Sequence, residues 1–198
     1  MRWLTLYARS RHAPASLAVV LISALAVWAL ARTGDGKPWS GWLPVLVLVA
    51  GAAAVSVGLG GQDPALERTA AIRWMPRRVA HVLLGGVLIG AVLLAVQTMD
   101  GQQTSPALVL RNSAGLMGLV AVGAACWGRQ YAWTLPCVWL AFSMVVPPST
   151  DVVTQVLTWM LLPSGTAVGT WTALVLAAAG TAAHAAVGVG GGGGGVRR

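Results

Sequence analysis

Long apolar runs alternate along this chain with short polar connections. A run of about 20 apolar residues is long enough for a helix to cross the hydrocarbon core of a bilayer, and a helix satisfies its own backbone hydrogen bonds where lipid offers no partners. The runs lack the strict alternation of barrel strands. We therefore predict an all-α polytopic membrane protein with a single transmembrane domain over residues 1–189. Its six transmembrane helices are expected at residues 14–31, 42–60, 79–99, 107–127, 131–146 and 166–189.

Composition excludes a soluble domain. Hydrophobic residues make up 57% of the 198 residues and charged residues only 9%, whereas a soluble domain usually carries about 25% charged residues. The six glycines at residues 190–195 do not form a phosphate-binding loop, because the lysine and hydroxyl residue of that motif are missing. We expect residues 190–198 to form a flexible cytoplasmic tail.

Basic residues are strongly biased toward one side of the predicted membrane. Ten of the thirteen fall there, and only Arg32, Lys37 and Arg111 fall on the other side. Because loops rich in lysine and arginine stay in the cytoplasm, both termini are expected to be cytoplasmic. The net charge of +8 then reflects topology and attraction to anionic lipid. We expect no nucleic-acid partner, since the basic residues are dispersed around a membrane body.

The polar connection at residues 61–80 predicts a short cytoplasmic helix. Asp63 followed by a proline is a favourable helix start, Glu67 and Arg73 suit the helix dipole, and Pro76 is expected to stop the helix. An apolar stripe on such a helix is able to lie on lipid or to fill a groove of a cytoplasmic protein. The candidate docking residues are Asp63, Leu66, Glu67, Arg68, Ala70, Arg73, Trp74, Arg77 and Arg78.

A second short helix is predicted between the fifth and sixth runs. The apolar segment at residues 152–162 has eleven residues, too few to cross a bilayer. It follows two prolines and Asp151, which can cap its start. We expect a half-helix at the outer face of the membrane. It either lies flat at the interface or dips into the bilayer as a re-entrant segment, which is tolerated only under cover of protein or water.

The fourth run carries an unusual polar pair, Arg111 and Asn112, close to its outer end. A charge there is costly unless it snorkels to the interface, pairs with an acid or lines water. Asp100 and Asp151 are predicted on the same side and are candidate partners for Arg111. The alternative role is a gate or a contact for an anionic or amphiphilic substrate. The candidate residues of a substrate path are Arg111, Asn112, Gln155 and Trp159.

Small residues on the third and fourth runs allow helices to approach closely. They serve packing within one subunit or form the seam of a dimer. These residues are Gly86, Gly90, Ala114, Gly118 and Gly123. Cys126 and Cys137 lack a redox spacing and the histidines are isolated, so we expect no metal site. No hydrolase or metalloprotease motif is present, and we expect no catalytic site.

Several of these features together resemble the type-two ABC export permeases. They are six spans with both ends inside, a cytoplasmic helix between spans two and three, and an outer half-helix between spans five and six. A short N-terminal helix on the inner membrane surface fits the same pattern, and an ordinary basic flank is the alternative for that segment. This pattern covers nearly the whole chain. The stretches at residues 63–70, 76–78 and 111–116 are similar to actinobacterial permease-like subunits.

The resemblance implies a permease subunit without an ATPase of its own. Its cytoplasmic helix would be the coupling helix that docks on a separate ATP-binding cassette ATPase, which holds ATP and Mg. A second permease subunit would complete the path. The expected function is export of a hydrophobic or amphiphilic molecule by alternating access in a bacterial plasma membrane. The chain is more compact than many members. A substrate-binding subunit of a vitamin importer and a non-transporting structural subunit are the alternative functions.

Overall fold

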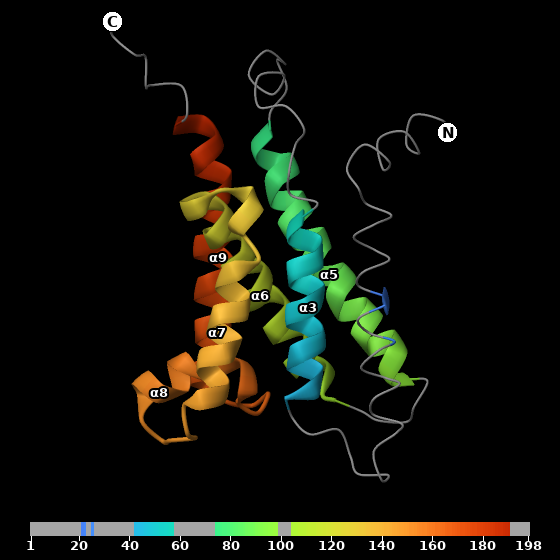
Figure 1. The fold of residues 1–198 in the computed structure, drawn as a ribbon, viewed down its shortest axis with the longest axis vertical. Coiled ribbons are helices and arrows are strands. Elements are labelled where there is room, and N and C mark those ends of the chain that lie inside the picture. Colours follow the sequence, from blue (N-terminus) through green and yellow to red (C-terminus); the bar gives the residue numbers. More distant parts are fainter. Residues whose placement is uncertain (1–20, 23–24, 26–41, 58–73, 99–103, 191–198) are drawn as a thin grey trace, which may run out of the picture.

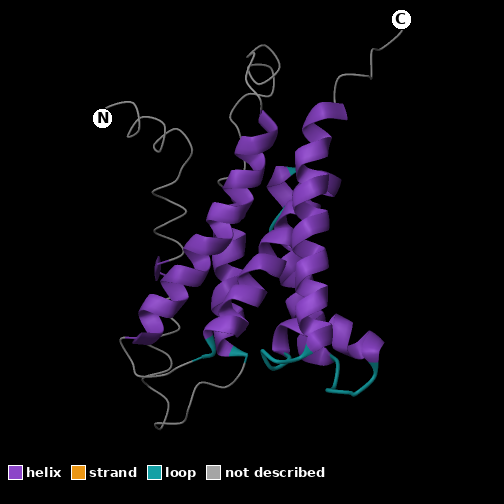
Figure 2. Cartoon of the chain, turned by 180° about the vertical axis from the view of Figure 1, so that it is seen from behind, coloured by secondary structure: helices purple, strands orange, loops and turns teal. Residues whose placement is uncertain are grey.

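The computed structural model describes residues 21–22, 25, 42–57, 74–98 and 104–190. Every regular element in this part of the chain is a helix, as the sequence predicts (Figure 2). In chain order the elements are α3 (Leu43–Val57), α5 (Trp74–Thr98), α6 (Pro106–Trp127), the 3-10 turn η1 (Arg129–Tyr131), α7 (Thr134–Val145), α8 (Val152–Leu157), the 3-10 turn η2 (Trp159–Leu161) and α9 (Ala167–Gly190).

Three helices of the described part are long and apolar enough to cross a membrane. They are the stretches Arg78–Thr98 of α5, Pro106–Trp127 of α6 and Ala167–Ala186 of α9. These correspond to the third, fourth and sixth predicted spans. The membrane character of the chain is therefore supported by helices that match the expected positions closely.

One other predicted span is shorter than expected. α7 has 12 residues, which at the helical rise gives a length of about 18 Å, less than the ~30 Å hydrocarbon core. α3 has 15 described residues, Leu43–Val57, and residues 58–60 of that predicted span lie outside the described part of the chain. α7 is short because η1 and a turn precede it, and because Val146 is already extended, as a residue before proline prefers. Of the first predicted span, Leu21, Ile22 and Leu25 are helical and exposed. The rest of that span and residues 191–198 lie outside the described residues.

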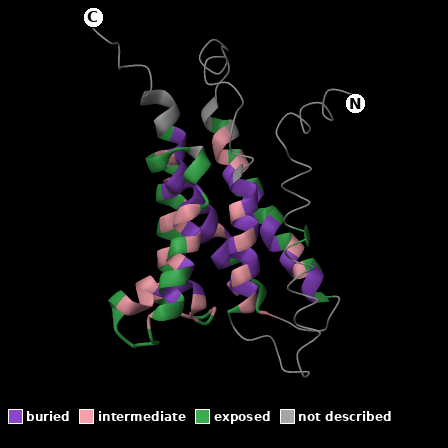
Figure 3. Cartoon of the chain, viewed as in Figure 1, coloured by how far each residue is buried: buried purple, intermediate pink, exposed green. Residues whose placement is uncertain are grey.

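α6 is the central helix of the bundle. It contacts α3, α5, α7 and α9, and most of its residues from Val109 to Ala124 are buried. α5 and α9 each expose a long face (Figure 3). α5 and α9 are therefore apolar on two sides. One side is buried against the bundle and the other side is exposed. Such exposed apolar surface suits a helix that faces lipid.

The most extensive helix contact joins α6 and α9. A Cβ atom at Gly118 of α6 would collide with the backbone of Leu176 and Ala177, and one at Gly180 of α9 would collide with the backbone of Gly118. Small residues at such a crossing allow two backbones to touch. The crossing brings the start of α9 close to the start of α6.

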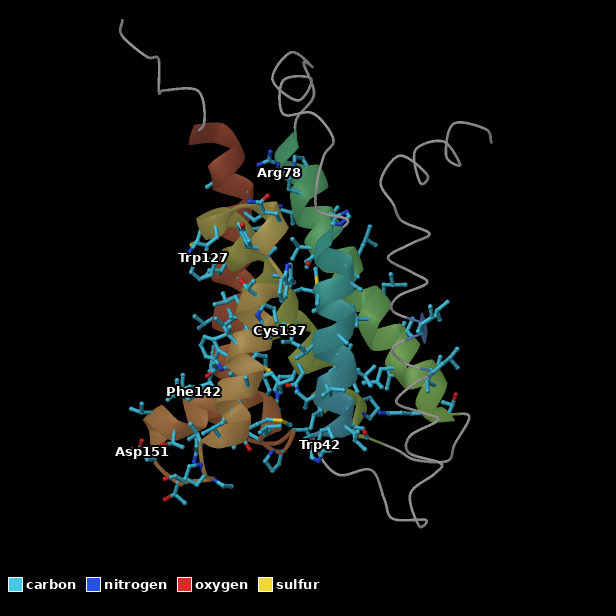
Figure 4. The ribbon with its side chains drawn as sticks, viewed as in Figure 1. Trp42, Arg78, Trp127, Cys137, Phe142 and Asp151 are labelled. Carbon is cyan, nitrogen blue, oxygen red and sulfur yellow. The ribbon has the colours of Figure 1, made fainter. Side chains whose placement is uncertain are left out.

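The connections predicted on the outer side of the membrane lie together at one end of the bundle, and those predicted on the inner side lie at the other end. Trp42, just before α3, and Asp151, just before α8, lie at the same end, whereas Arg78 and Trp127 lie at the opposite end (Figure 4). We call the end with Trp42 and Asp151 the outer end and the end with Arg78 and Trp127 the inner end, following the predicted orientation. Long helices that follow one another directly in the chain are therefore antiparallel, whereas α6 and α9 run parallel to each other.

Pro76 does not end a helix, contrary to the sequence prediction. It is the third residue of α5, which begins at Trp74 and continues to Thr98. A proline is tolerated in a first turn, because the amide there has no intrahelical partner. Three docking candidates, Trp74, Arg77 and Arg78, therefore belong to the start of α5. The others lie outside the described residues: Asp63, Leu66, Glu67, Arg68, Ala70 and Arg73.

Candidate functional site

Between α7 and α9 the chain turns back on itself at the outer end of the bundle (Figure 1). We name residues 147–166, which contain α8 and η2, the half-hairpin. Asp151 caps α8, because its carboxylate accepts a hydrogen bond from the backbone N–H of Thr154 (3.2 Å). The predicted cap is confirmed. None of the residues of α8 is buried, so this first part of the half-hairpin lies on the outside of the bundle.

The second part of the half-hairpin turns into the protein. Trp159 and Met160 of η2 are fully buried. The chain leaves the 3-10 turn at Leu162, whose extended backbone is the conformation favoured before Pro163. Protein therefore covers the end of the predicted half-helix, as a re-entrant segment requires, whereas α8 keeps the exposure of an interfacial helix.

Arg111 of α6 binds backbone carbonyls of η2 and of the extended residues that follow it. Its Nη1 donates to the O atom of Pro163 (2.8 Å), and its Nη2 donates to the O atoms of Trp159 (3.1 Å) and Leu162 (2.7 Å). Its Nε donates to Oδ1 of Asn112 (3.1 Å). These contacts engage four of the five N–H groups of a guanidinium. The carbonyls lie where a helical segment ends, which is where a cation is favourable.

Asn112 completes the contact from the next position of α6. Its Nδ2 donates to the O atom of Met160 (2.8 Å), while its Oδ1 accepts from Arg111. The side chain is fully buried, so its amide has to find partners within the protein. Two consecutive residues of α6 thus serve the carbonyls of Trp159, Met160, Leu162 and Pro163.

α7 supplies further donors to the half-hairpin. Nε1 of Trp139 donates to the O atom of Leu157 (2.9 Å), the last residue of α8. The hydroxyl of Ser143 lies 2.8 Å from the O atoms of both Leu157 and Trp139 and is able to donate to either. The last carbonyls of a helix have no intrahelical donor. Side chains from two neighbouring helices therefore satisfy the end of α8 and the turn that follows it.

Two glycines make room for the anchoring side chains. A Cβ atom at Gly115 of α6 would collide with the indole of Trp159, and one at Gly169 of α9 would lie 3.0 Å from Nη1 of Arg111. The indole Nε1 of Trp159 is buried without a hydrogen-bond partner. Trp159 therefore holds the half-hairpin by packing, and Arg111 holds it by hydrogen bonds.

The structure brings together three of the four candidate path residues. Arg111, Asn112 and Trp159 meet at the inward end of the half-hairpin, whereas Gln155 donates to the O atom of Thr150 (3.2 Å) on the outside. Arg111 is 7% exposed, so it does not snorkel to the surface. The carboxylate of Asp151 caps α8 instead of pairing with Arg111, and Asp100 lies outside the described residues.

Sequence reasoning missed several residues of this site. Trp139, Ser143, Gly115 and Gly169 are not among the site residues that the sequence predicts. The four-residue spacing of Trp139 and Ser143 was an available signal, because it places two donors on one face of an apolar helix. The two glycines carried no such signal, since the side chains they accommodate come from distant parts of the chain.

The small-residue candidates lie between elements of this chain. Gly86 and Gly90 of α5 face α6: a Cβ at Gly86 would lie 3.5 Å from Cγ of Met117, and one at Gly90 3.4 Å from the Ser113 hydroxyl. Gly118 faces α9. A Cβ at Gly123 would lie 3.0 Å from the backbone O of Ala132. Ala114 is half-buried.

The described part of the chain contains no group of three or more His, Cys, Asp or Glu side chains placed to hold a metal ion. Comparisons with models of protein families, with curated proteins and with solved structures found no match to this chain. The site must therefore be interpreted from its own geometry. Since Arg111 has at most one N–H group left for another partner, the arrangement is built to hold the half-hairpin against α6 and α7.

Proposed function

We propose that the chain is the membrane-spanning permease subunit of an ATP-binding cassette transporter that exports a hydrophobic or amphiphilic molecule by alternating access. A separate ATPase subunit binds ATP and Mg and supplies the energy. A second permease subunit, identical or related, completes the path. In this proposal the chain crosses a bacterial plasma membrane six times and keeps both termini in the cytoplasm.

The observation that carries this proposal is the half-hairpin between α7 and α9, held against α6 by a buried arginine. The resemblance to type-two export permeases implies a half-helix at this position in the chain. Arg111 lies five residues after the start of α6, or about 8 Å along the helix. Charged residues at such depth are rare in spanning helices.

The chemistry of the described helices favours an apolar or amphiphilic substrate. Three buried hydroxyls donate to backbone carbonyls three or four residues earlier in the chain: Ser56 to Ala53, Ser113 to Leu110, and Thr158 to Thr154. Hydroxyls engaged in this way have no proton left to donate to an anion. A molecule with a large apolar part needs no such donor.

The proposal predicts that an ATPase subunit accompanies the protein. Purification from its native membrane in mild detergent is expected to recover a nucleotide-binding subunit and ATP hydrolysis. Replacing Glu67 and Arg68 together by alanine should strongly reduce recovery of that subunit, because these charges belong to the candidate coupling helix. Recovered ATPase activity per mole of permease is the measurement.

A matched control replaces Arg197 and Arg198 by alanine, which removes charge on the same predicted side but outside the loop. ATPase recovery should be unchanged in this control. Purification of an unaccompanied monomer that holds a small molecule would overturn the export proposal in favour of the importer subunit. A stable assembly without any ATPase would point to a structural subunit.

A further inference from the structure

The half-hairpin has two surfaces of opposite chemistry. Its inward surface accepts hydrogen bonds from α6 and α7 at the carbonyls described above. Its outward surface exposes Val152 (61%) and Val153 (67%) on α8. α8 contacts α7, which itself exposes Phe142 (50%) and Val145 (83%) toward the same end of the bundle. None of these four exposed side chains carries a charge or a polar group.

The exposed apolar surface lies between a polar tip and the body of the bundle. Asp151 lies at the outer tip, and Phe142 lies on α7 nearer the middle of the bundle (Figure 4). Ser149 and Thr150 are exposed beside Asp151. Polar side chains at the tip suit water, and apolar side chains on its inward side suit lipid. This order is the one expected across the outer boundary of a bilayer.

Some of the carbonyl groups that Arg111 contacts also accept hydrogen bonds from nearby backbone N–H groups. The O atom of Trp159 also accepts from the N–H of Leu162 (3.4 Å), and the O atom of Pro163 accepts from the N–H of Thr166 (3.1 Å). Two of the three carbonyls therefore have a donor without Arg111. The guanidinium adds one donor group on α6 that binds all three carbonyl oxygens at the same time.

We propose that Arg111 and Asn112 are positioning residues that set the depth of the half-hairpin in the membrane. Arg111 lies five residues into α6, so it holds η2 about 8 Å inward from the start of that helix. The two valines of α8 are thereby kept in the lipid of the outer leaflet, and lipid acyl chains cover the exposed face shared by α7 and α8. This inference requires only that the chain is inserted in a membrane and is independent of the export function.

The geometry of the contact requires arginine. The three nitrogens of the guanidinium reach the O atoms of Pro163, Trp159 and Leu162 and the Oδ1 of Asn112 at the same time. A lysine ammonium carries its donors on one atom and lacks this planar fork. Arg111→Lys therefore keeps the charge but loses part of the contact. Arg111→Met loses both.

The test measures the depth of α8 in the full-length chain, reconstituted in vesicles of phosphatidylethanolamine and phosphatidylglycerol. Cys126 and Cys137 are replaced by serine, and a nitroxide label is attached at Val153→Cys. Collisions with oxygen, which concentrates in lipid, are compared with collisions with a neutral nickel chelate, which stays in water. We expect oxygen to dominate with Arg111 present, the ratio to reverse in Arg111→Met, and Arg111→Lys to fall between them.

Two further label positions are the controls. A label at Thr150→Cys on the polar tip should remain accessible to the chelate in every variant. A label at Val175→Cys, on the exposed face of α9 (60%), should remain in lipid and reports that the bundle is still inserted. A general loss of structure would move the label at 175, whereas release of the half-hairpin moves only the label at 153.

Each outcome decides the proposal. A label at 153 that meets mainly the chelate with Arg111 present overturns the lipid assignment, and a label shielded from both reagents shows that protein covers this face. An unchanged ratio in Arg111→Met overturns the positioning role. If Arg111→Met also moves the label at 175, Asn112→Ala takes its place, because it removes the contacts to Met160 and to Nε of Arg111 without removing charge. A shift at 153 alone then supports the role, and no shift overturns it.

Discussion

Arg111 places a positive charge inside a largely apolar helix, and its neighbours explain why the fold tolerates it. Taking a charge out of water costs several kcal/mol unless hydrogen bonds compensate for it. Here three main-chain carbonyls and the side chain of Asn112 supply that compensation. Gly169 leaves the space that the guanidinium needs. The charge is therefore stabilised by oriented dipoles and not by an acidic partner among the described residues.

At the same scale, Gly118 is expected to be intolerant of any side chain. Gly118→Ala would drive a methyl group into the backbone of Leu176 and Ala177, so α6 and α9 would have to separate. We expect a loss of about 1–3 kcal/mol in the free energy of unfolding, as for other overpacked sites. The unfolding midpoint in mixed micelles, followed by tryptophan fluorescence, checks this prediction.

Gly86→Ala is the matched control for this substitution. Both glycines lie within long helices, so alanine improves the helix propensity of both by about 1 kcal/mol. A Cβ at Gly86 makes only an ordinary contact, 3.5 Å from Met117. Gly86→Ala should therefore be neutral or slightly stabilising. Equal effects of the two substitutions would contradict the close crossing of α6 and α9.

At the scale of elements, the half-hairpin depends on its ends. α8 has six residues, fewer than an isolated helix needs for stability in water. Its start is capped by Asp151, and its last residue, Leu157, receives donors from α7. Neighbouring helices therefore stabilise an element whose own sequence is too short to be stable. The same prolines that shorten α7 begin this segment.

Removal of the cap should loosen α8 selectively. Asp151→Ala deletes the acceptor of the Thr154 amide, a loss worth about 0.5–2 kcal/mol at other helix starts. We expect faster hydrogen exchange of the α8 amides and little change in α6. Asp151→Asn keeps an acceptor oxygen and should stay near the parent rate. If Asn exchanges as fast as Ala, the carboxylate charge matters and the cap does not.

At the scale of the whole molecule, the two ends of the bundle are expected to lie on opposite sides of the membrane. Gln130 of η1 and Thr150 of the half-hairpin are both exposed and lie in connections predicted inside and outside respectively. In a chain without Cys126 and Cys137, a membrane-impermeant thiol reagent should label Thr150→Cys in intact cells. Gln130→Cys should react only after the cells are opened, because basic loops stay in the cytoplasm. The reverse pattern would invert the predicted orientation.

Much of the helical organisation could be predicted from the sequence, because it depends on local patterns. α5, α6 and α9 follow apolar runs long enough to span, and the start of α8 follows from Asp151 and its neighbours. The boundary at Pro76 was predicted wrongly, because a proline is compatible both with the residue after a helix and with the first turn of the next one. The length of α7 also differed from the apolar run that contains it.

The sequence by itself determined the class of this protein: an apolar, helical chain with a biased distribution of basic residues and a polar pair near one end of its fourth run. The tertiary structure alone decided what that pair does. Arg111 and Asn112 find their partners 48 to 52 positions further along the chain, and Gly115 and Gly169 are needed only because those partners arrive there. Hydrophobic periodicity reports the environment of each segment, whereas the partner of a buried donor depends on which segments meet in space.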